Sequence, residues 1–283
     1  MKIAEFKIQF KDELSELYTD SESDFIYSIF IEKISGFNKV QQRIFSGNEL
    51  SVEQENQIQN IISELKAGKP YQHILGETEF YGMIFYVNKN VLIPRPETEE
   101  LLEIAIQNIQ NLFSESKNLK ILDIGTGSGI IPLVLKKYFP NSKVSSIDFS
   151  EKALEVAKKN AAFHQFDIDF IHTDYLNYNL NEMYDVIISN PPYIGIEEER
   201  EIDDSVKGFE PKMALFSPTS DALIFYRKIA EDAKKYLDKN GLFFLEINQK
   251  LGQQTLELYQ NSFLKAELIK DLSGNDRFIF GIK

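Results

Sequence analysis

The chain has 283 residues, 43% of them hydrophobic and 27% charged, which is typical of a globular protein with a substantial core. Its 31 basic and 44 acidic residues give a formal net charge of −13, which argues against a protein that grips a phosphate backbone, because that needs clustered cations. The absence of cysteine excludes disulfides and thiolate catalysis, and three histidines make a zinc site unexpected.

The N-terminus, MKIAEFKIQF, lacks the apolar core of a signal peptide. No apolar run in the sequence approaches the roughly 20 residues that cross a bilayer. We therefore expect a cytoplasmic protein that does not bind membranes.

Residues 1–75 are predicted to form a small all-α N-terminal domain. Ser51 and Gln54 have the spacing of a capping box at the start of a helix. Apolar residues then recur at the spacing of one helix face: Ile58, Ile61, Ile62 and Leu65.

Residues 76–94 are rich in aromatic and β-branched residues around Gly82, which predicts a short β-hairpin linking two domains. Pro96 is well placed to open the next helix, because proline suits the first helical position.

Predicted strands and helices alternate in the third region, residues 95–283. The expected strands are 120–124, 143–148, 169–173, 184–189 and 241–247, and the expected helices between them are 130–138, 151–163 and 221–237. This alternation predicts an α/β fold with a mostly parallel sheet covered on both faces. The last two strands, 265–272 and 277–282, leave no room for a helix between them, which indicates an antiparallel hairpin at one edge of the sheet.

A glycine-rich turn follows the first of these strands, with glycines at 125, 127 and 129. Glycine lets a backbone approach a ligand closely, and the N–H groups at a helix start attract anionic groups. Ile130 stands where the dinucleotide fingerprint requires its third glycine, so a nicotinamide oxidoreductase is disfavoured. Asp148 ends the next strand, where an acid can accept both ribose hydroxyls. Together they predict a site for an adenosine-containing ligand, although Asp148 could instead cap the following helix, a task for which Ser150 competes.

The turn Asn190-Pro191-Pro192-Tyr193 follows another apolar strand, so it faces the same crevice at the carboxyl ends of the strands. The side-chain oxygen of Asn190 and the carbonyl of Pro191 are acceptors. Two convergent acceptors suit a planar NH2 group, and Tyr193 offers a face on which a flat group can stack. An ordinary turn is the alternative interpretation.

Taken together, the glycine loop, Asp148 and the Asn190–Tyr193 turn resemble class I S-adenosylmethionine-dependent methyltransferases that act on a planar nitrogen. Three further stretches resemble the release factor glutamine methyltransferase family: residues 70–82, 92–99 with the sequence Arg-Pro-Glu-Thr-Glu, and Glu210-Pro211. The resemblance implies a Rossmann-like seven-stranded sheet with an antiparallel edge strand. It also implies methyl transfer to the glutamine of the Gly-Gly-Gln motif of peptide chain release factors, with S-adenosylhomocysteine as the product.

By this resemblance the cofactor is held by Gly125, Thr126, Gly127, Ser128, Gly129, Asp148, Asp174, Tyr175 and Asn190. Asn190, Pro191 and Tyr193 are the implied catalytic residues and, with Pro192, the implied substrate-binding residues; no metal is implied. Arg95, Glu97 and Glu99 are either a wall of the site or only the acidic start of a helix.

The sequence departs from the family pattern at residues 217–223, where glycines are usual, and at Asn248. The resemblance leaves open a glutamine methyltransferase for a ribosomal protein and, against the net charge, a DNA adenine methyltransferase. A nucleotide-binding module without catalysis would not need the acceptors of the Asn190 turn. We expect a monomer that binds release factors and makes no direct contact with nucleic acid.

Overall fold

The computed structural model describes residues 1–113, 118–195 and 204–283. These residues form two compact units. The first contains Met1–Gly76 together with helix α9 (Asp204–Phe209), and the second contains the rest of the described chain from Glu77 onward. Among the described helices, none is long and apolar enough to cross a membrane.

Helices make up the first unit. They are α1 (Ile3–Leu14), α2 (Asp20–Ser35), α3 (Lys39–Ile44), α4 (Val52–Lys66) and α5 (Tyr71–Leu75), with α9 grouped beside them. The predicted capping box is confirmed, because Ser51 Oγ accepts from the Gln54 N–H and Gln54 Oε1 accepts from the Ser51 N–H. One face of α4 is buried through Ile58, Ile62 and Leu65.

The predicted hairpin consists of β1 (Glu77–Phe80) and β2 (Met83–Tyr86), paired antiparallel. It packs into the second unit, so it is not the separate linker that we expected at residues 76–94. Phe85 is fully buried in the core of that unit. The side chain of Asn160 also makes two hydrogen bonds to the backbone of Tyr86, at 2.7 and 3.0 Å.

The main sheet has seven strands among the described residues, in the order β5-β4-β3-β6-β7-β9-β8. The strands are β3 (Lys120–Ile124), β4 (Lys143–Asp148), β5 (Asp169–His172), β6 (Tyr184–Ser189), β7 (Leu237–Glu246), β8 (Lys265–Lys270) and β9 (Asp276–Ile282). The first five pair in parallel, which confirms the mostly parallel sheet. The strand that runs against the others is β9, one place in from the edge strand β8.

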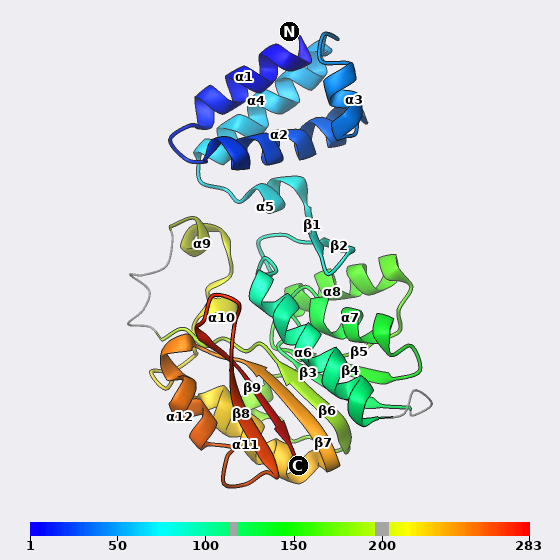
Figure 1. Ribbon diagram of the computed structural model, residues 1–283, viewed down its shortest axis with the longest axis vertical. Helices are drawn as coiled ribbons and strands as arrows, with labels where there is room; N and C mark the ends of the chain where they lie inside the picture. Colours follow the sequence, from blue (N-terminus) through cyan, green and yellow to red (C-terminus); the bar gives the residue numbers. More distant parts are fainter. Residues whose placement is uncertain (114–117, 196–203) are drawn as a thin grey trace. The chain divides into compact units, whose positions relative to one another are not determined.

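Helices cover both faces of this sheet (Figure 1). Helices α6 (Pro96–Leu112), α7 (Ile130–Tyr138) and α8 (Glu151–His164) pack on one face, and α11 (Ile224–Tyr236) and α12 (Gly252–Glu257) on the other. The short elements η1 (Tyr175–Asn177), α10 (Lys212–Leu215) and η3 (Gln249–Leu251) lie in the connections. Strand β6 is buried along its whole length, as its apolar sequence predicts.

The loops that matter for function leave the sheet at one edge. Strand β3 pairs in parallel with both β4 and β6, with Ile124 opposite Ile147 and Ser189. The segments that follow these three strands therefore start side by side, at the point where the strand order reverses and where α/β sheets bind ligands.

Candidate active site

The glycine loop between β3 and α7 has the backbone that its sequence predicts. Gly125, Gly127 and Gly129 all have positive φ angles, of 89°, 53° and 86°, a region that other residues adopt only with strain. A Cβ atom at Gly125 would lie 3.4 Å from the Asn190 carbonyl oxygen. The loop and the Asn190 turn are therefore in close contact, and a glycine is needed there.

Asp148, at the end of β4, faces this loop. Its Oδ2 accepts the Gly127 N–H at 2.9 Å, and its Oδ1 accepts the Ser150 N–H at 2.7 Å. Ser150 caps α8 by accepting the Ala153 N–H, so Asp148 does not serve as the cap. Burial raises the pKa of Asp148, although the backbone N–H groups oppose that shift. Asp148 thus orders the loop and lines the pocket beside it.

A buried acid that sequence reasoning gave no role lies beneath the loop. Asp123 accepts a hydrogen bond from Ser146 Oγ at 2.5 Å, and Ser146 Oγ is 2.6 Å from Thr126 Oγ1. Within the described chain, Asp123 Oδ1 has no hydrogen-bond partner. Burial raises the pKa of Asp123 to about 7. Its position just before the glycine loop was the only indication in the sequence that Asp123 belongs to the site.

Asp174 and Tyr175 form a third part of the wall. The Asp174 carboxylate accepts the Leu176 N–H at 3.1 Å and the Asn177 side-chain amide at 2.6 Å. The hydroxyl of the buried Tyr175 donates to Asp232. Both side chains therefore have structural partners.

The turn after β6 brings three of its four residues to the pocket: Asn190, Pro191 and Pro192. Tyr193 is not among the residues that line the pocket. Its ring packs against the core on the α11 face of the sheet, and its hydroxyl donates to Glu246 Oε1 at 3.2 Å. This differs from our expectation that the Tyr193 ring offers a stacking surface.

The Arg95–Glu99 segment is both a wall of the site and a helix start. Pro96 is the first residue of α6, while Arg95 and Thr98 line the pocket. Arg95 Nη2 donates to Glu210 Oε1 at 2.6 Å, and the Ile93 N–H donates to Glu210 Oε2 at 2.8 Å. Glu210, fully buried at its side chain, thereby ties the segment before α6 to the segment at α10.

The neighbouring acids of this segment have other surroundings. Glu99 accepts the Tyr81 N–H at 2.6 Å and so anchors the hairpin turn. Glu97 is half-buried, and its negative charge contributes to raising the pKa of Glu246.

Replacing Arg95 by alanine should lower the free energy of unfolding by about 1–3 kcal/mol, because the buried Glu210 carboxylate loses a charged partner. Urea denaturation measures this change. The matched control is Arg227→Ala, which removes the exposed Arg227–Asp221 pair and should cost less than about 1 kcal/mol. Equal losses in the two variants would show that the Arg95–Glu210 pair is no more important than a surface ion pair.

The two departures from the family pattern lie close to the site. Ser217 Oγ donates to the Asp221 carbonyl at 2.9 Å, which closes a local turn in residues 217–223. Asn248 donates to the Tyr193 carbonyl at 3.2 Å and accepts the Lys250 N–H at 2.9 Å. Asn248 thus supports the Asn190–Tyr193 turn from below.

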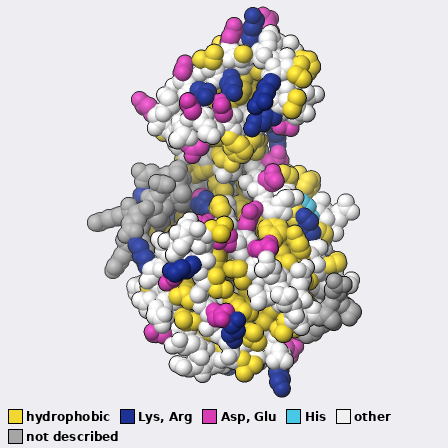
Figure 2. Space-filling model, viewed as in Figure 1, with side chains coloured by type: hydrophobic (Ala, Val, Ile, Leu, Met, Phe, Trp, Pro, Cys, Tyr) yellow, Lys and Arg dark blue, Asp and Glu magenta, His cyan; other side chains and the backbone are white. Residues whose placement is uncertain are grey.

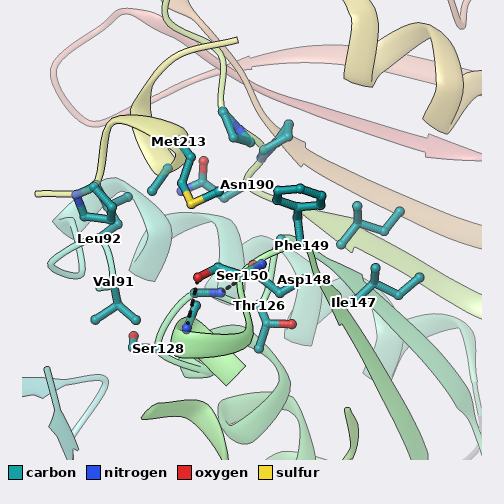
Figure 3. A pocket seen from close by; sticks show the side chains of 18 of the residues that line it. Val91, Leu92, Thr126, Ser128, Ile147, Asp148, Phe149, Ser150, Asn190 and Met213 are labelled. Atoms are coloured by element: carbon teal, nitrogen blue, oxygen red, sulfur yellow. Dashed lines mark hydrogen bonds between the residues drawn. The ribbon is translucent and has the colours of Figure 1, made fainter. Parts of the chain in front are cut away.

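The assembled pocket is mostly apolar, with a few polar groups in it (Figure 3). In Figure 3, Asn190 and Met213 lie on one side of the opening, and Thr126 and Ser128 lie on the other. Sequence reasoning missed several apolar lining residues: Val91, Leu92, Phe149, Met213 and Phe216. Phe149 directly follows Asp148, and Leu92 begins one of the stretches that resemble the family, but neither had been assigned to the pocket. No cluster of three or more potential metal ligands occurs among the described residues.

Comparisons with known proteins agree with this geometry. Residues 102–206 match the family model of the methyltransferase small domain, and residues 8–76 match that of the PrmC N-terminal domain. The chain is 45% identical over 282 residues to a release factor glutamine methyltransferase of Flavobacterium psychrophilum, covering 99% of this chain and 98% of that protein. A protein of the same name from Streptococcus pneumoniae is 39% identical over 285 residues, with 99% and 98% covered.

A solved structure supports the fold alone. A methyltransferase from Pyrococcus furiosus is similar with a TM-score of 0.52 at 18% identity, covering 78% of this chain and 98% of that one.

Proposed function

The chain belongs to the release factor glutamine methyltransferase family, and from this membership we propose its reaction. It transfers a methyl group from S-adenosylmethionine to the side-chain amide nitrogen of the glutamine in the Gly-Gly-Gln motif of peptide chain release factors. The structural observation that supports this reaction is the contact between the glycine loop and the Asn190 turn within one pocket, which suits a cofactor wall beside the acceptors for the target amide.

The pocket fits S-adenosylmethionine in its chemistry. Gly125, Gly127 and Gly129 keep one wall free of side chains, so the methionine part can lie against the backbone. Asp148 supplies a carboxylate for the ribose hydroxyls. Ile147 and Phe149 supply apolar surface beside the Asp174–Leu176 segment for the adenine. When bound, the cofactor supplies an electrophilic methyl group on a sulfonium.

The residues of this chain hold and activate the target nitrogen. An amide nitrogen is a poor nucleophile because its lone pair is delocalised into the carbonyl. Asn190 Oδ1 and the Pro191 carbonyl accept the two hydrogens of the glutamine NH2 group and fix its direction. These bonds strengthen as the nitrogen becomes positive, so they stabilise the transition state more than the bound substrate. Tyr193 anchors the end of this turn, because its ring packs against the core and its hydroxyl donates to Glu246.

The alternatives receive less support. The relatives with the highest identity carry the release factor name, and the ribosomal-protein and DNA activities are not favoured by them. On the face shown in Figure 2, Lys and Arg side chains are scattered among Asp and Glu. Such a surface suits a protein partner better than a nucleic acid backbone.

The proposal is tested by incubating a release factor with the enzyme and isotopically labelled cofactor, then locating the label by tandem mass spectrometry. We expect one labelled methyl group on the glutamine of the Gly-Gly-Gln motif. Label on another residue, with that glutamine unmodified, would contradict the proposed substrate.

We further propose that the first unit recognises the release factor, since every group assigned to the cofactor and to the target amide lies in the second unit. An enzyme lacking residues 1–76 should methylate an intact release factor at least about tenfold more slowly, because contacts that orient the partner are lost. Its affinity for S-adenosylmethionine should stay within about threefold of the full chain. Calorimetry and single-turnover transfer measure these two quantities, and circular dichroism checks that the truncated enzyme is folded. Normal transfer by a folded truncated enzyme would assign the unit another role.

A further inference from the structure

We infer that Thr98 and Glu246 are positioning residues, which hold the amide of Asn190 with its oxygen toward the pocket and its NH2 group away from it. The inference rests on the proposed function, in which Asn190 Oδ1 accepts a hydrogen from the target amide.

The three side chains form a continuous hydrogen-bonded chain from three separate elements. Asn190, after β6, donates from Nδ2 to Thr98 Oγ1 at 3.1 Å. Thr98, in the first turn of α6, donates to Glu246 Oε2 at 2.7 Å. Thr98 and Glu246, at the end of β7, are each only 1% exposed. Glu246 does not line the pocket, so it acts on the target indirectly, by way of Thr98 and Asn190.

The available hydrogen-bond donors and acceptors fix the direction of the Asn190 amide. The ionised Glu246 carboxylate can only accept. Thr98 has a single hydroxyl hydrogen, and it is committed to that carboxylate. Thr98 Oγ1 can therefore only accept from Asn190, so the NH2 group of Asn190 must face Thr98. The oxygen is then left on the pocket side, where an amide NH2 group can donate to it.

The second oxygen of Glu246 is also occupied by a donor. Burial raises the pKa of Tyr193 far above neutrality, so its hydroxyl keeps its hydrogen and donates to Glu246 Oε1. Burial likewise raises the pKa of Glu246, to about 7, with Glu97 acting in the same direction. The charge of Arg277, on β9, opposes this shift, as do the hydrogen bonds from Thr98 and Tyr193. The carboxylate is thus predominantly ionised only above about pH 7. The protonated form carries a hydrogen of its own, so the Thr98 hydroxyl is no longer forced to donate to it.

Two substitutions at position 98 separate positioning from packing. Thr98→Val keeps the shape but removes the hydroxyl, and it should lower the single-turnover rate roughly 10- to 100-fold. Cofactor affinity should change by less than about threefold. Thr98→Ser restores a hydroxyl and should recover most of the lost rate. Thr255→Val is the matched control, because Thr255, in α12, is equally buried but lies outside the pocket and donates to the carbonyl of Leu251, the last residue of η3. It should leave the rate unchanged.

A pH series tests the part of Glu246. The ratio of the wild-type rate to that of Glu246→Gln cancels pH effects common to both proteins, including titration of Asp123. We expect the ratio to be largest above about pH 8 and to fall toward one as the pH drops through about 7, because protonated Glu246 resembles glutamine. A structural role would give a ratio that does not depend on pH.

The outcomes distinguish this inference from the function on which it rests. A wild-type enzyme that fails to methylate the release factor glutamine would overturn the proposed function. Wild-type activity with an equally active Thr98→Val, or with Thr98→Ser as impaired as Thr98→Val, would overturn the inference alone. A ratio that stays constant between pH 6 and pH 9, both about one unit or more from the pKa, would overturn the assigned role of the Glu246 charge.

Discussion

Asn190→Ala should lower the single-turnover rate of methyl transfer on the order of 100- to 1,000-fold, as the loss of one preorganised polar group at a reaction centre typically does. The variant removes the side-chain acceptor for the target NH2 group and leaves the Pro191 carbonyl as the remaining acceptor. Rapid-quench measurement at saturating cofactor and release factor reports this rate directly.

Cofactor affinity is the internal control for this variant. Asn190 lies on the side of the pocket opposite Thr126 and Ser128, so the dissociation constant of S-adenosylmethionine should change by less than about fivefold. Asn108→Ala provides a matched control, because it removes an amide from α6 that donates to the Ile104 carbonyl and does not line the pocket. A folded Asn190→Ala enzyme with a rate within about threefold of the wild type would contradict the proposed mechanism.

Asp148→Ala should weaken S-adenosylmethionine binding by roughly 10- to 100-fold, because hydrogen bonds to a charged acceptor contribute about 1.5–3 kcal/mol. The structure adds a second reason, since the same carboxylate orders Gly127 and Ser150. Isothermal titration calorimetry measures the affinity. Asp167→Ala, which removes an exposed carboxylate beyond α8, is the control. Unchanged affinity in a folded Asp148→Ala protein would remove Asp148 from the site.

Features set by local sequence could be predicted. The capping box at Ser51 involves side chains three residues apart, and Pro96 suits a helix start whatever its surroundings. The meeting of the glycine loop, Asp148 and Asn190 also followed from sequence. In a mostly parallel sheet, strands that alternate with helices end at one edge, so the segments after β3, β4 and β6 had to lie together.

Individual side-chain partners that are distant in sequence could not be predicted. Tyr193 donates a hydrogen bond to Glu246, 53 residues away on β7. This bond holds the Tyr193 ring against the core, away from the pocket. Arg95 bonds to Glu210, 115 residues away. The acidic pattern of residues 95–99 could not reveal which of its side chains would face the pocket. Thr98, which accepts a hydrogen bond from Asn190, had no feature in the sequence that indicated a role in the site.

The limits of the two units also depend on packing between segments that are distant in sequence. The hairpin of residues 77–86 was expected between two domains, because its composition differs from both neighbours. In the structure the hairpin belongs to the second unit, because Phe85 is buried in the core of that unit and Asn160 binds the hairpin backbone. The inclusion of α9 in the first unit had no signal in sequence, because more than 120 residues separate it from the other helices of that unit.

The most direct test of the central claim is single-turnover transfer of labelled methyl to three substrates under identical conditions. They are an intact release factor, the same factor with the glutamine of its Gly-Gly-Gln motif replaced by alanine, and duplex DNA. We expect label on the intact factor only, with a rate at least about 100-fold lower when the glutamine is replaced. Equal labelling of the intact and substituted factors, or methylated adenine in the DNA with the glutamine untouched, would contradict it.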